Sequence, residues 1–357
     1  MSQLHTPLQI GSVQLPNRIF MAPLTRMRAF EQRSVGDLQV EHYRQRATAG
    51  LILTEATSVC PMGVGYPNTP GIWSAQQVSG WKRVTDAVHA AGGHIAVQLW
   101  HVGRISDPEL LDGQLPVAPS AIAAEGDVSV LRPKRPYAVP RALETAEIAG
   151  IVQDFVQAAR NAKEAGFDFI EVHAANGYLF DQFLHEGSNQ RTDQYGGSIE
   201  NRARFLLETV DALLKEWPAE RIGVHLNPMS NTHSMSDSNP VALFTYVAEQ
   251  LQARKLGFIF SREELKDGVL PIGQHMRQVF KGAFIANDGF TAEQAQAVVA
   301  SGAADAVAFG RAFIANPDLP ERIAKGAAWN ELNASTIYSP DATGYNDYPT
   351  LEQLQAK

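Results

Sequence analysis

Three polar side chains with complementary chemistry stand close together within the stretch 168–204. His173, Asn176 and Tyr178 follow the apolar run 169–172, which suits a short buried strand. An imidazole and an amide can donate hydrogen bonds to a developing anion, and a phenol can supply a proton. His173 and Asn176 are three residues apart, so one helical turn would point both the same way. A lone histidine or tyrosine here is more often structural, but the three together favour a substrate site.

The residues after this group predict a rigid support for it. Residues 189–197 form a polar loop that glycines interrupt, and Ser198 is placed to cap a helix that runs from about Asn201. We expect this loop to hold the three polar side chains in place.

Strand-like and helix-like segments alternate along the rest of the chain. Helical patterns occupy 36–49, 76–91, about 145–165 and 239–254, and Thr291 caps another. The strand-like runs are 18–22, 51–56, 95–100, 169–172, 222–226, 258–260, 283–286 and 306–309. Open doubly wound sheets usually have fewer strands and a Gly-x-Gly-x-x-Gly fingerprint, which no strand here precedes. The alternation therefore predicts an α/β fold, a single (β/α)8 TIM barrel.

Two segments depart from this alternation. Residues from about 104 to 143 are rich in proline but too apolar for disorder, so we expect an excursion with short strands after the third barrel strand. Residues from about 327 to 357 form an irregular C-terminal tail. We expect residues 1–357 to form a single domain, because barrels of this kind often exceed 250 residues.

Composition limits the classes of partner. The formal net charge of -8 argues against a nucleic-acid partner, because phosphate binding needs concentrated lysine and arginine. The sequence has no apolar run long enough to cross a bilayer and no signal-peptide pattern at its start, so a cytoplasmic location is the expectation. The single cysteine, Cys60, excludes an internal disulfide and a four-thiolate metal or iron–sulfur site.

In a barrel of this type, chemistry gathers at the carboxyl ends of the strands. After the last two predicted strands, Gly289 and Gly310-Arg311 combine close backbone approach with a cation, which is typical of a phosphate site. Arg311 could equally be a solvated residue that starts the final helix. Asp288 suits an anion site only if its side chain turns away.

The stretch 168–204 closely resembles the signature of the old yellow enzyme family of FMN-dependent ene-reductases. The shared elements are His-x-Ala-x-Gly-Tyr-Leu, Gln-Phe-Leu, Asn-x-Arg-x-Asp, Tyr-Gly-Gly-Ser and Glu-Asn-Arg. Further blocks of the family resemble this chain from about residue 8 to residue 351. They include Ala22-Pro23-Leu24-Thr25-Arg26, Val97-Gln98-Leu99-Trp100-His101, Phe309-Gly310-Arg311 and Tyr345-Asn346-Asp347-Tyr348-Pro349.

The resemblance implies one noncovalent FMN and two successive small-molecule partners. These are NADPH or NADH as reductant and then an electrophilic alkene or nitro compound such as an enone, enal, maleimide, nitroalkene or nitrate ester. By the resemblance, His173 and Asn176 grip the electron-withdrawing group and Tyr178 donates the proton. The implied FMN-binding residues are Pro23, Thr25, Ala56, Gln98, His225, Gly289, Gly310 and Arg311. Tyr66, Trp100 and Tyr345 are implied to line the substrate pocket, although core packing explains an aromatic residue equally well.

Two departures from the family pattern point to a subgroup. Many members have a second histidine where this chain has Asn176, and an arginine where it has His225. Bacterial xenobiotic reductases, similar to N-ethylmaleimide reductase, resemble the chain in both respects. If His225 becomes protonated beside the flavin, it should raise the FMN potential at low pH. The other possibility is that His225 is a neutral, hydrogen-bonded spacer.

Other functions fit part of the pattern. A barrel isomerase or aldolase acting on a phosphorylated metabolite would share the fold and the phosphate loop, but it would usually need a lysine or carboxylate at the strand ends. The related iron–sulfur dienoyl-CoA reductases need a cysteine cluster that is absent here. A non-catalytic flavin sensor would share the binding residues, but Tyr178 argues against it. The oligomeric state, monomer or homodimer, stays open.

Overall fold

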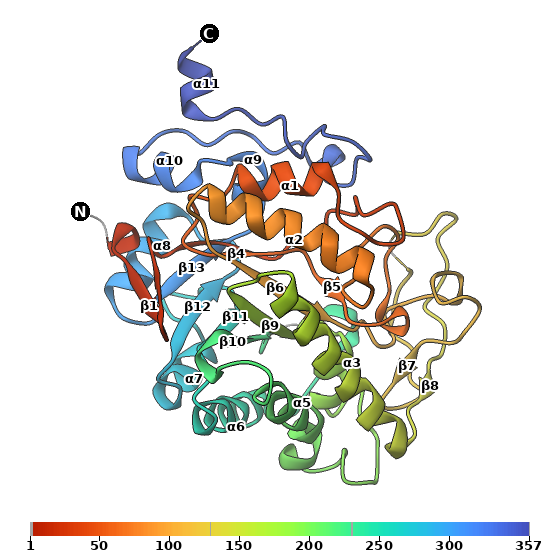
Figure 1. Cartoon of the computed structure of the whole chain (residues 1–357). Coiled ribbons are helices and arrows are strands. Elements are labelled where there is room, and N and C mark those ends of the chain that lie inside the picture. The colour runs from red at the N-terminus through yellow and green to blue at the C-terminus, as the bar shows by residue number, and fades with distance from the viewer. Residues whose placement is uncertain (1–2, 129, 230, 357) are drawn as a thin grey trace.

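The computed structural model, which describes residues 3–128, 130–229 and 231–356, contains a closed barrel of eight parallel strands. The order in the sheet is β4-β3-β13-β12-β11-β10-β9-β6, and a pairing between β4 and β6 closes it (Figure 1). The barrel strands are β3 (Ile19–Met21), β4 (Ile52–Leu53), β6 (Ile95–Trp100), β9 (Phe169–Ala174), β10 (Ile222–Leu226), β11 (Phe258–Arg262), β12 (Ala283–Asn287) and β13 (Ala306–Phe309). The predicted TIM barrel is confirmed.

Helices surround the barrel (Figure 1). The larger ones are α1 (Asp37–Arg44), α2 (Ala75–Ala90), α3 (Thr145–Glu164), α5 (Ile199–Leu213), α6 (Pro240–Ala253) and α8 (Ala292–Ala300). Ser74, Ser198 and Thr291 cap three of them by accepting a backbone N–H bond three residues on. The pattern did not predict α4 (Leu179–Leu184) or α7 (Gly273–Val279).

Two predicted elements differ from the structure. The helix expected over 36–49 ends at Arg44, and the chain turns because the buried Arg46 guanidinium bonds to the carbonyls of Phe313 and Ile314. The strand expected over 51–56 is shortened to β4, and a separate short strand, β5 (Thr57–Ser58), follows just beyond it. The ladder breaks where the Thr54 hydroxyl accepts the Gln98 N–H at 3.2 Å, in place of a backbone carbonyl.

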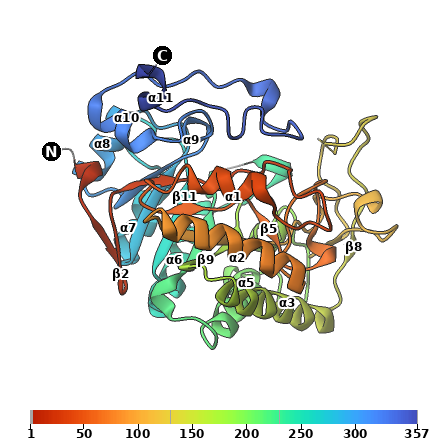
Figure 2. The same cartoon turned by 45° about the horizontal axis from the view of Figure 1, so that its top comes forward.

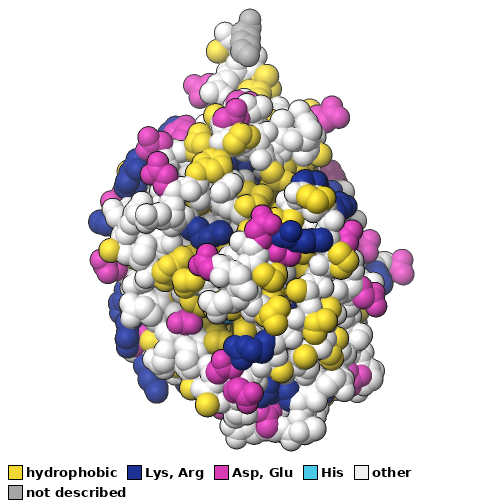
Figure 3. Space-filling view, turned by 90° about the vertical axis from the view of Figure 1, so that its right-hand side faces the viewer, with side chains coloured by type: hydrophobic (Ala, Val, Ile, Leu, Met, Phe, Trp, Pro, Cys, Tyr) yellow, Lys and Arg dark blue, Asp and Glu magenta, His cyan; other side chains and the backbone are white. Residues whose placement is uncertain are grey.

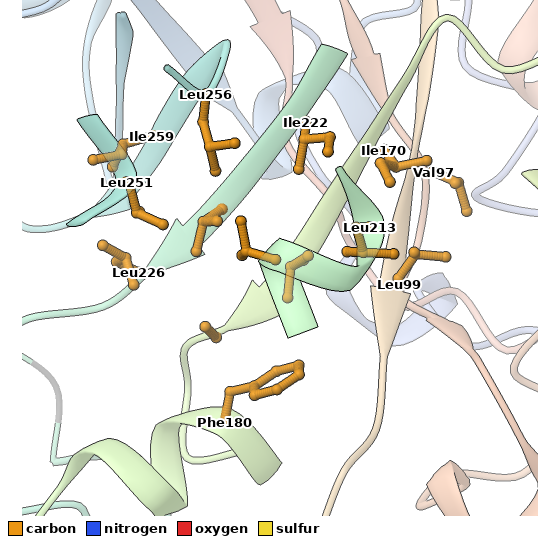
Figure 4. Close-up of a cluster of buried hydrophobic side chains, with 14 of the residues drawn as sticks. Val97, Leu99, Ile170, Phe180, Leu213, Ile222, Leu226, Leu251, Leu256 and Ile259 are labelled. Atoms are coloured by element: carbon orange, nitrogen blue, oxygen red, sulfur yellow. The ribbon is translucent and has the colours of Figure 1, made fainter. Parts of the chain in front are cut away.

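The strands are buried on both faces, and their alternation sorts side chains into two layers. Outward-facing residues of β6, β9 and β10 pack against the surrounding helices. Figure 4 shows this for Val97, Ile170 and Ile222 of the strands and Leu213 of α5. The residues between them point into the barrel. This alternation is what turns the polar residues of the same strands inward.

The amino end of the barrel is filled by apolar side chains. The hairpin of β1 (Leu8–Ile10) and β2 (Val13–Leu15) packs its inner residues onto the interior cluster that contains Phe169 and Phe258. Gly223 makes room for this packing, because a Cβ there would lie 2.1 Å from the Phe258 ring. The amino end of the barrel is therefore closed by packed side chains. A cavity can form only towards the carboxyl ends of the strands.

The predicted excursion carries β7 (Val117–Ala118) and β8 (Arg141–Ala142), which pair in parallel. On the face that includes this segment, acidic and basic side chains are interspersed (Figure 3). Among the described residues, none of the helices has the length and apolar character needed to cross a membrane.

The C-terminal segment lies over α1 (Figures 1 and 2). It contains α9 (Arg311–Ala315), α10 (Leu319–Lys325) and α11 (Leu351–Gln355), joined by irregular chain. The buried side chains of Arg26 and Arg28 donate to backbone carbonyls of the tail, including those of Gly344 and Ile337. These bonds fix the tail although few of its residues form regular structure.

Candidate functional site

A cavity of about 1010 Å³ opens at the carboxyl ends of the barrel strands. Every predicted site residue except Tyr345 lines this cavity. These residues are Pro23, Thr25, Ala56, Tyr66, Gln98, Trp100, His173, Asn176, Tyr178, His225, Gly289, Gly310 and Arg311.

Strand register sets the polar floor of this cavity. In β6 and β9, Gln98 is the register partner of Glu171, and His173 of β9 is the partner of His225 in β10. All four side chains are buried. The two imidazole rings stack with centroids 4.9 Å apart and an interplanar angle of 18°.

The Gln98 amide connects two of these groups. Its Nε2 donates to Glu171 Oε2 at 2.7 Å and to His225 Nδ1 at 3.0 Å. Both amide hydrogens are then used, so Gln98 Oε1 is left as an acceptor. Burial raises the pKa of the Glu171 carboxyl to about 8 and the Gln98 hydrogen bond opposes the rise, so Glu171 is largely protonated at neutral pH.

His225 is a neutral imidazole with a defined tautomer. Because Gln98 donates to Nδ1, the ring proton is on Nε2, which has no hydrogen-bond partner within the described residues. Burial holds the pKa of His225 well below its usual range, and the positive charge of Arg262 lowers it further. The structure supports the neutral spacer rather than a protonated His225.

His173 is also held neutral. Burial lowers its pKa to about 3, with a further contribution from the positive charge of Arg262. The ring stands edge-on to Tyr178, with centroids 4.9 Å apart, and its Nδ1 has no partner within the described part of the chain. A neutral imidazole can still donate one N–H bond to a ligand oxygen.

Tyr178 lies against two other aromatic residues of the cavity wall. Its hydroxyl is 3.0 Å from that of Tyr66, and its ring is edge-on to the buried Trp100 with centroids 5.0 Å apart. Burial raises the pKa of Tyr178 well above its usual value, and the Tyr66 hydrogen bond opposes the rise. The phenol is therefore protonated at neutral pH.

Asn176 reaches the cavity by a different backbone route from the one expected. The predicted helical turn is wrong: β9 continues to Ala174, and Asn176 has a left-handed backbone with φ of 58°. Asparagine tolerates this conformation better than most residues. Its carbonyl accepts a bond from His233 Nδ1 at 2.7 Å, which holds the turn. α4 begins only at Leu179.

The opposite end of the cavity carries the predicted phosphate residues. Gly289 has φ of 72°, Gly310 precedes the first turn of α9, and Arg311 opens that helix with an exposed side chain. Asp288 turns its carboxylate to Arg262, with 3.4 Å between Oδ2 and Nε. This arrangement leaves glycine backbone and the Arg311 cation facing the cavity.

Tyr345 requires a correction, because it is not among the cavity-lining residues. It is fully buried and stacks on His42, with ring centroids 3.8 Å apart. The guanidinium of Arg28 lies 4.3 Å from its ring centroid on the cation–π side. Tyr345 belongs to the anchor of the tail, as the alternative of core packing anticipated.

The sequence pattern missed two parts of the wall. Arg262 ends β11, two residues beyond the predicted strand, and lines the cavity. The signal for it was a charged residue two positions after an apolar strand-like run. The tail contributes Trp329, Leu332 and Tyr338, for which the sequence carries no local signal.

Comparisons with known proteins agree over almost the whole chain. Residues 3–330 match the family described as NADH:flavin oxidoreductase / NADH oxidase. The solved structure of morphinone reductase in complex with tetrahydroNAD is 52% identical, with a TM-score of 0.94 and 98% of each chain covered. The old yellow enzyme homologue NCR from Zymomonas mobilis is 41% identical, with a TM-score of 0.94 and coverage of 98% of this chain and 100% of that one. The 12-oxophytodienoate reductase 2 of Arabidopsis thaliana is 43% identical over 372 residues, which span 98% of this chain and 96% of the relative.

Proposed function

Because this chain belongs to the NADH:flavin oxidoreductase / NADH oxidase family, the old yellow enzyme family, we propose that its cavity holds FMN and that His173, Asn176 and Tyr178 act on an activated alkene. The chain is an FMN-dependent oxidoreductase, and relatives named as morphinone and 12-oxophytodienoate reductases reduce C=C bonds. The observation that supports this assignment of roles is that these three side chains line the same cavity as Gly310 and Arg311.

The residues present fit FMN. Some buried polar atoms have no partner in the described chain, among them His225 Nε2 and His173 Nδ1. Such atoms would suit a ring that offers several hydrogen-bond acceptors and donors. Gln98 Oε1 is left as an acceptor beside them. Gly289, Gly310 and Arg311 supply N–H groups and a cation for the phosphate. When bound, FMN supplies the hydride transfer between NAD(P)H and the second substrate.

Three side chains of this protein would do the remaining chemistry. His173 and Asn176 would donate hydrogen bonds to the carbonyl or nitro oxygen, where negative charge develops as the β-carbon accepts hydride. Tyr178 Oη would transfer its proton to the α-carbon. Tyr66, whose hydroxyl is 3.0 Å away, is placed to hold Tyr178 in position.

We extend the proposal to substrates, partners and organisation. Enones, enals, maleimides and nitroalkenes share the polarised oxygen that this wall can bind, and nitrate esters or nitroaromatics are further candidates. Residues 1–357 would act as one FMN-binding domain, since the cavity wall runs from β3 to the tail. With a formal net charge of -8, no nucleic-acid partner is expected, and a cytoplasmic monomer or homodimer is proposed.

One anaerobic titration tests the function. Purified protein should show the visible spectrum of FMN, lose it on addition of NADPH, and recover it on addition of cyclohexenone. Protein that is colourless and cannot be reconstituted with FMN would instead favour a barrel that binds a phosphorylated metabolite. Flavin that NADPH reduces but no alkene reoxidises would indicate a sensor.

The Tyr178→Phe variant tests the proton donor in the same titration. Loss of a general acid should slow reoxidation by cyclohexenone by roughly 10²–10⁴-fold and leave flavin reduction by NADPH nearly unchanged. Tyr66→Phe is the matched control, since it removes a hydroxyl from the same pair and keeps the donor. Equal slowing of both half-reactions in Tyr178→Phe would make Tyr178 structural.

A further inference from the structure

The side-chain amide of Asn176 is held from two directions. Its Oδ1 accepts from Asn227 Nδ2 at 2.6 Å and from Arg262 Nη1 at 3.1 Å. Asn227 follows β10 and is buried, whereas Arg262 ends the neighbouring strand β11. Neither contact was expected from the stretch that contains Asn176.

These two contacts determine which way the amide faces. A guanidinium has donors only, so the atom next to Arg262 must be the amide oxygen and not the nitrogen. Within the described residues, Asn176 Nδ2 makes no hydrogen bond, and the residue lines the cavity. Both Nδ2 hydrogens are therefore available to a ligand.

Arg262 is itself anchored and directed at the site. Its Nε is 3.4 Å from Asp288 Oδ2, and Asp288 has the unusual backbone φ of 125°. The positive charge of Arg262 adds to burial in lowering the pKa of both His173 and His225. Its electric field therefore extends to the polar floor of the cavity. A cation hydrogen-bonded to an amide oxygen also polarises the amide and strengthens its N–H groups as donors.

We propose that Arg262, with Asn227, is a positioning residue that locks the Asn176 amide with its NH₂ towards the cavity and so makes it a strong donor to an anionic oxygen. The proposal rests on the proposed function, in which Asn176 grips the substrate. It explains how an asparagine beside His173 can serve in a site that must stabilise negative charge while both buried histidines remain neutral.

Ligand affinity in the FMN-loaded enzyme tests the proposal. The probes are 4-hydroxybenzaldehyde, which can bind as the phenolate, and 4-methoxybenzaldehyde, which cannot ionise. Arg262→Met removes the donors and should weaken 4-hydroxybenzaldehyde by about tenfold, the lower end of what a charge-assisted hydrogen bond contributes. Its effect on 4-methoxybenzaldehyde should be smaller, and Arg262→Lys should restore most of the loss.

Two further variants separate the local effect from a general one. Asn227→Leu removes the second donor to Asn176 with no change of charge and should weaken the same probe by a few-fold. Arg254→Gln is the matched control, because Arg254 also pairs with an aspartate, Asp211, but on the outer helices. Its affinities should equal those of the unmodified enzyme.

A double-mutant cycle decides whether Arg262 acts through Asn176. In an Asn176→Ala background, Arg262→Met should have little further effect on 4-hydroxybenzaldehyde. If the full tenfold loss persists there, Arg262 acts directly on the anion and the positioning role is wrong. Equal affinities for Arg262→Met and the unmodified enzyme would also overturn it. Failure of the unmodified enzyme to hold FMN or bind either probe would instead count against the proposed function.

Discussion

The electrostatics of the candidate site depend on a few individual side chains at the carboxyl ends of β9, β10 and β11. His173 and His225 are buried and neutral, so the fixed positive charge at this end of the cavity comes from Arg262. The sequence resemblance places a family arginine at the position of His225. In this chain an arginine reaches the same cavity from the neighbouring strand, which makes a charged His225 unnecessary.

In a plot of FMN reduction potential against pH, we therefore expect no change of slope that depends on His225. Because Gln98 donates to Nδ1 and burial holds the pKa of His225 well below its usual range, we expect His225 to stay neutral throughout the measurement, from about pH 5.5 to 9. Potential measured against pH should give parallel curves for the unmodified enzyme and His225→Gln. His225→Arg adds a fixed charge, and about 1 kcal/mol of attraction would raise a two-electron potential by about 20 mV throughout.

A bend near neutral pH in the unmodified enzyme that His225→Gln removes would mean that bound FMN raises the pKa of His225 into the measured range. Such a shift would have to overcome the burial of the imidazole first and then the positive charge of Arg262.

At the scale of elements, the turn between β9 and α4 is what presents Asn176 and Tyr178 together. Asn176 and Gly177 both have positive φ, of 58° and 78°, and the turn is closed by His233. Two consecutive left-handed residues are costly for ordinary side chains, which is why asparagine and glycine stand here.

Gly177→Ala should disturb both stability and the site. A Cβ at this glycine would lie 2.8 Å from the His233 Cβ and from the Thr232 carbonyl oxygen, so backbone must shift in addition to the strain of positive φ. Gly197→Ala is the control, since its φ is 84° and nothing lies within 4 Å of the added Cβ. Gly197→Ala should cost about 1 kcal/mol of unfolding free energy, and Gly177→Ala roughly 1–3 kcal/mol more.

Denaturant unfolding and 4-hydroxybenzaldehyde binding measure this pair of variants. Because the Asn176 carbonyl bonds to His233, the shift forced by Gly177→Ala should also weaken the probe, whereas Gly197→Ala should not. Equal losses of stability in the two variants would show that φ strain alone matters here and that the turn can move away from His233 freely.

Elements with strong local signals were predictable, and those that depend on distant partners were not. The bounds of β6 and β10 match the predicted runs, because each is an apolar segment that begins and ends abruptly. The break near Thr54 depends on a hydroxyl that binds another strand. Arg262 belongs to β11 because it pairs with Asn287 of β12. The sequence around Arg262 alone does not indicate this pairing.

The same reasoning applies to the site. Strand alternation alone is enough to turn Gln98, His173 and His225 inward, so these were predictable from sequence. The place of Tyr345 was not, because it depends on His42 and on Arg28, both more than 300 residues earlier in the chain. The amide lock on Asn176 was invisible for a similar reason, since it needs three strand ends to meet.

At the scale of the whole molecule, closing the barrel encloses ionisable groups whose charging then opposes folding. Glu171 is fully buried, and burial raises the pKa of its carboxyl to about 8 from an ordinary value near 4.5. The folded state thus holds this proton more tightly than the unfolded chain does. Stability is full below the unfolded pKa and is lost as pH rises towards the folded pKa, at up to about 1.4 kcal/mol per pH unit.

Glu171→Gln should remove this part of the pH dependence in the FMN-loaded enzyme. Glutamine imitates the protonated acid and can still accept the Gln98 N–H bond. From about pH 5.5 to 7.5 the melting temperature of the unmodified enzyme should fall relative to that of the variant by about 4 °C, given ~2.1 cal/mol/K per residue of unfolding entropy. Glu55, whose pKa burial raises to about 7, and the buried histidines contribute equally to both curves, so their difference isolates Glu171.

Glu249→Gln on the exposed face of α6 is the control, and its melting curve against pH should run parallel to that of the unmodified enzyme. If the Glu171→Gln curve were also parallel, the carboxyl would be charged within the barrel, and the Gln98 amide would have to stabilise an anion rather than a neutral acid.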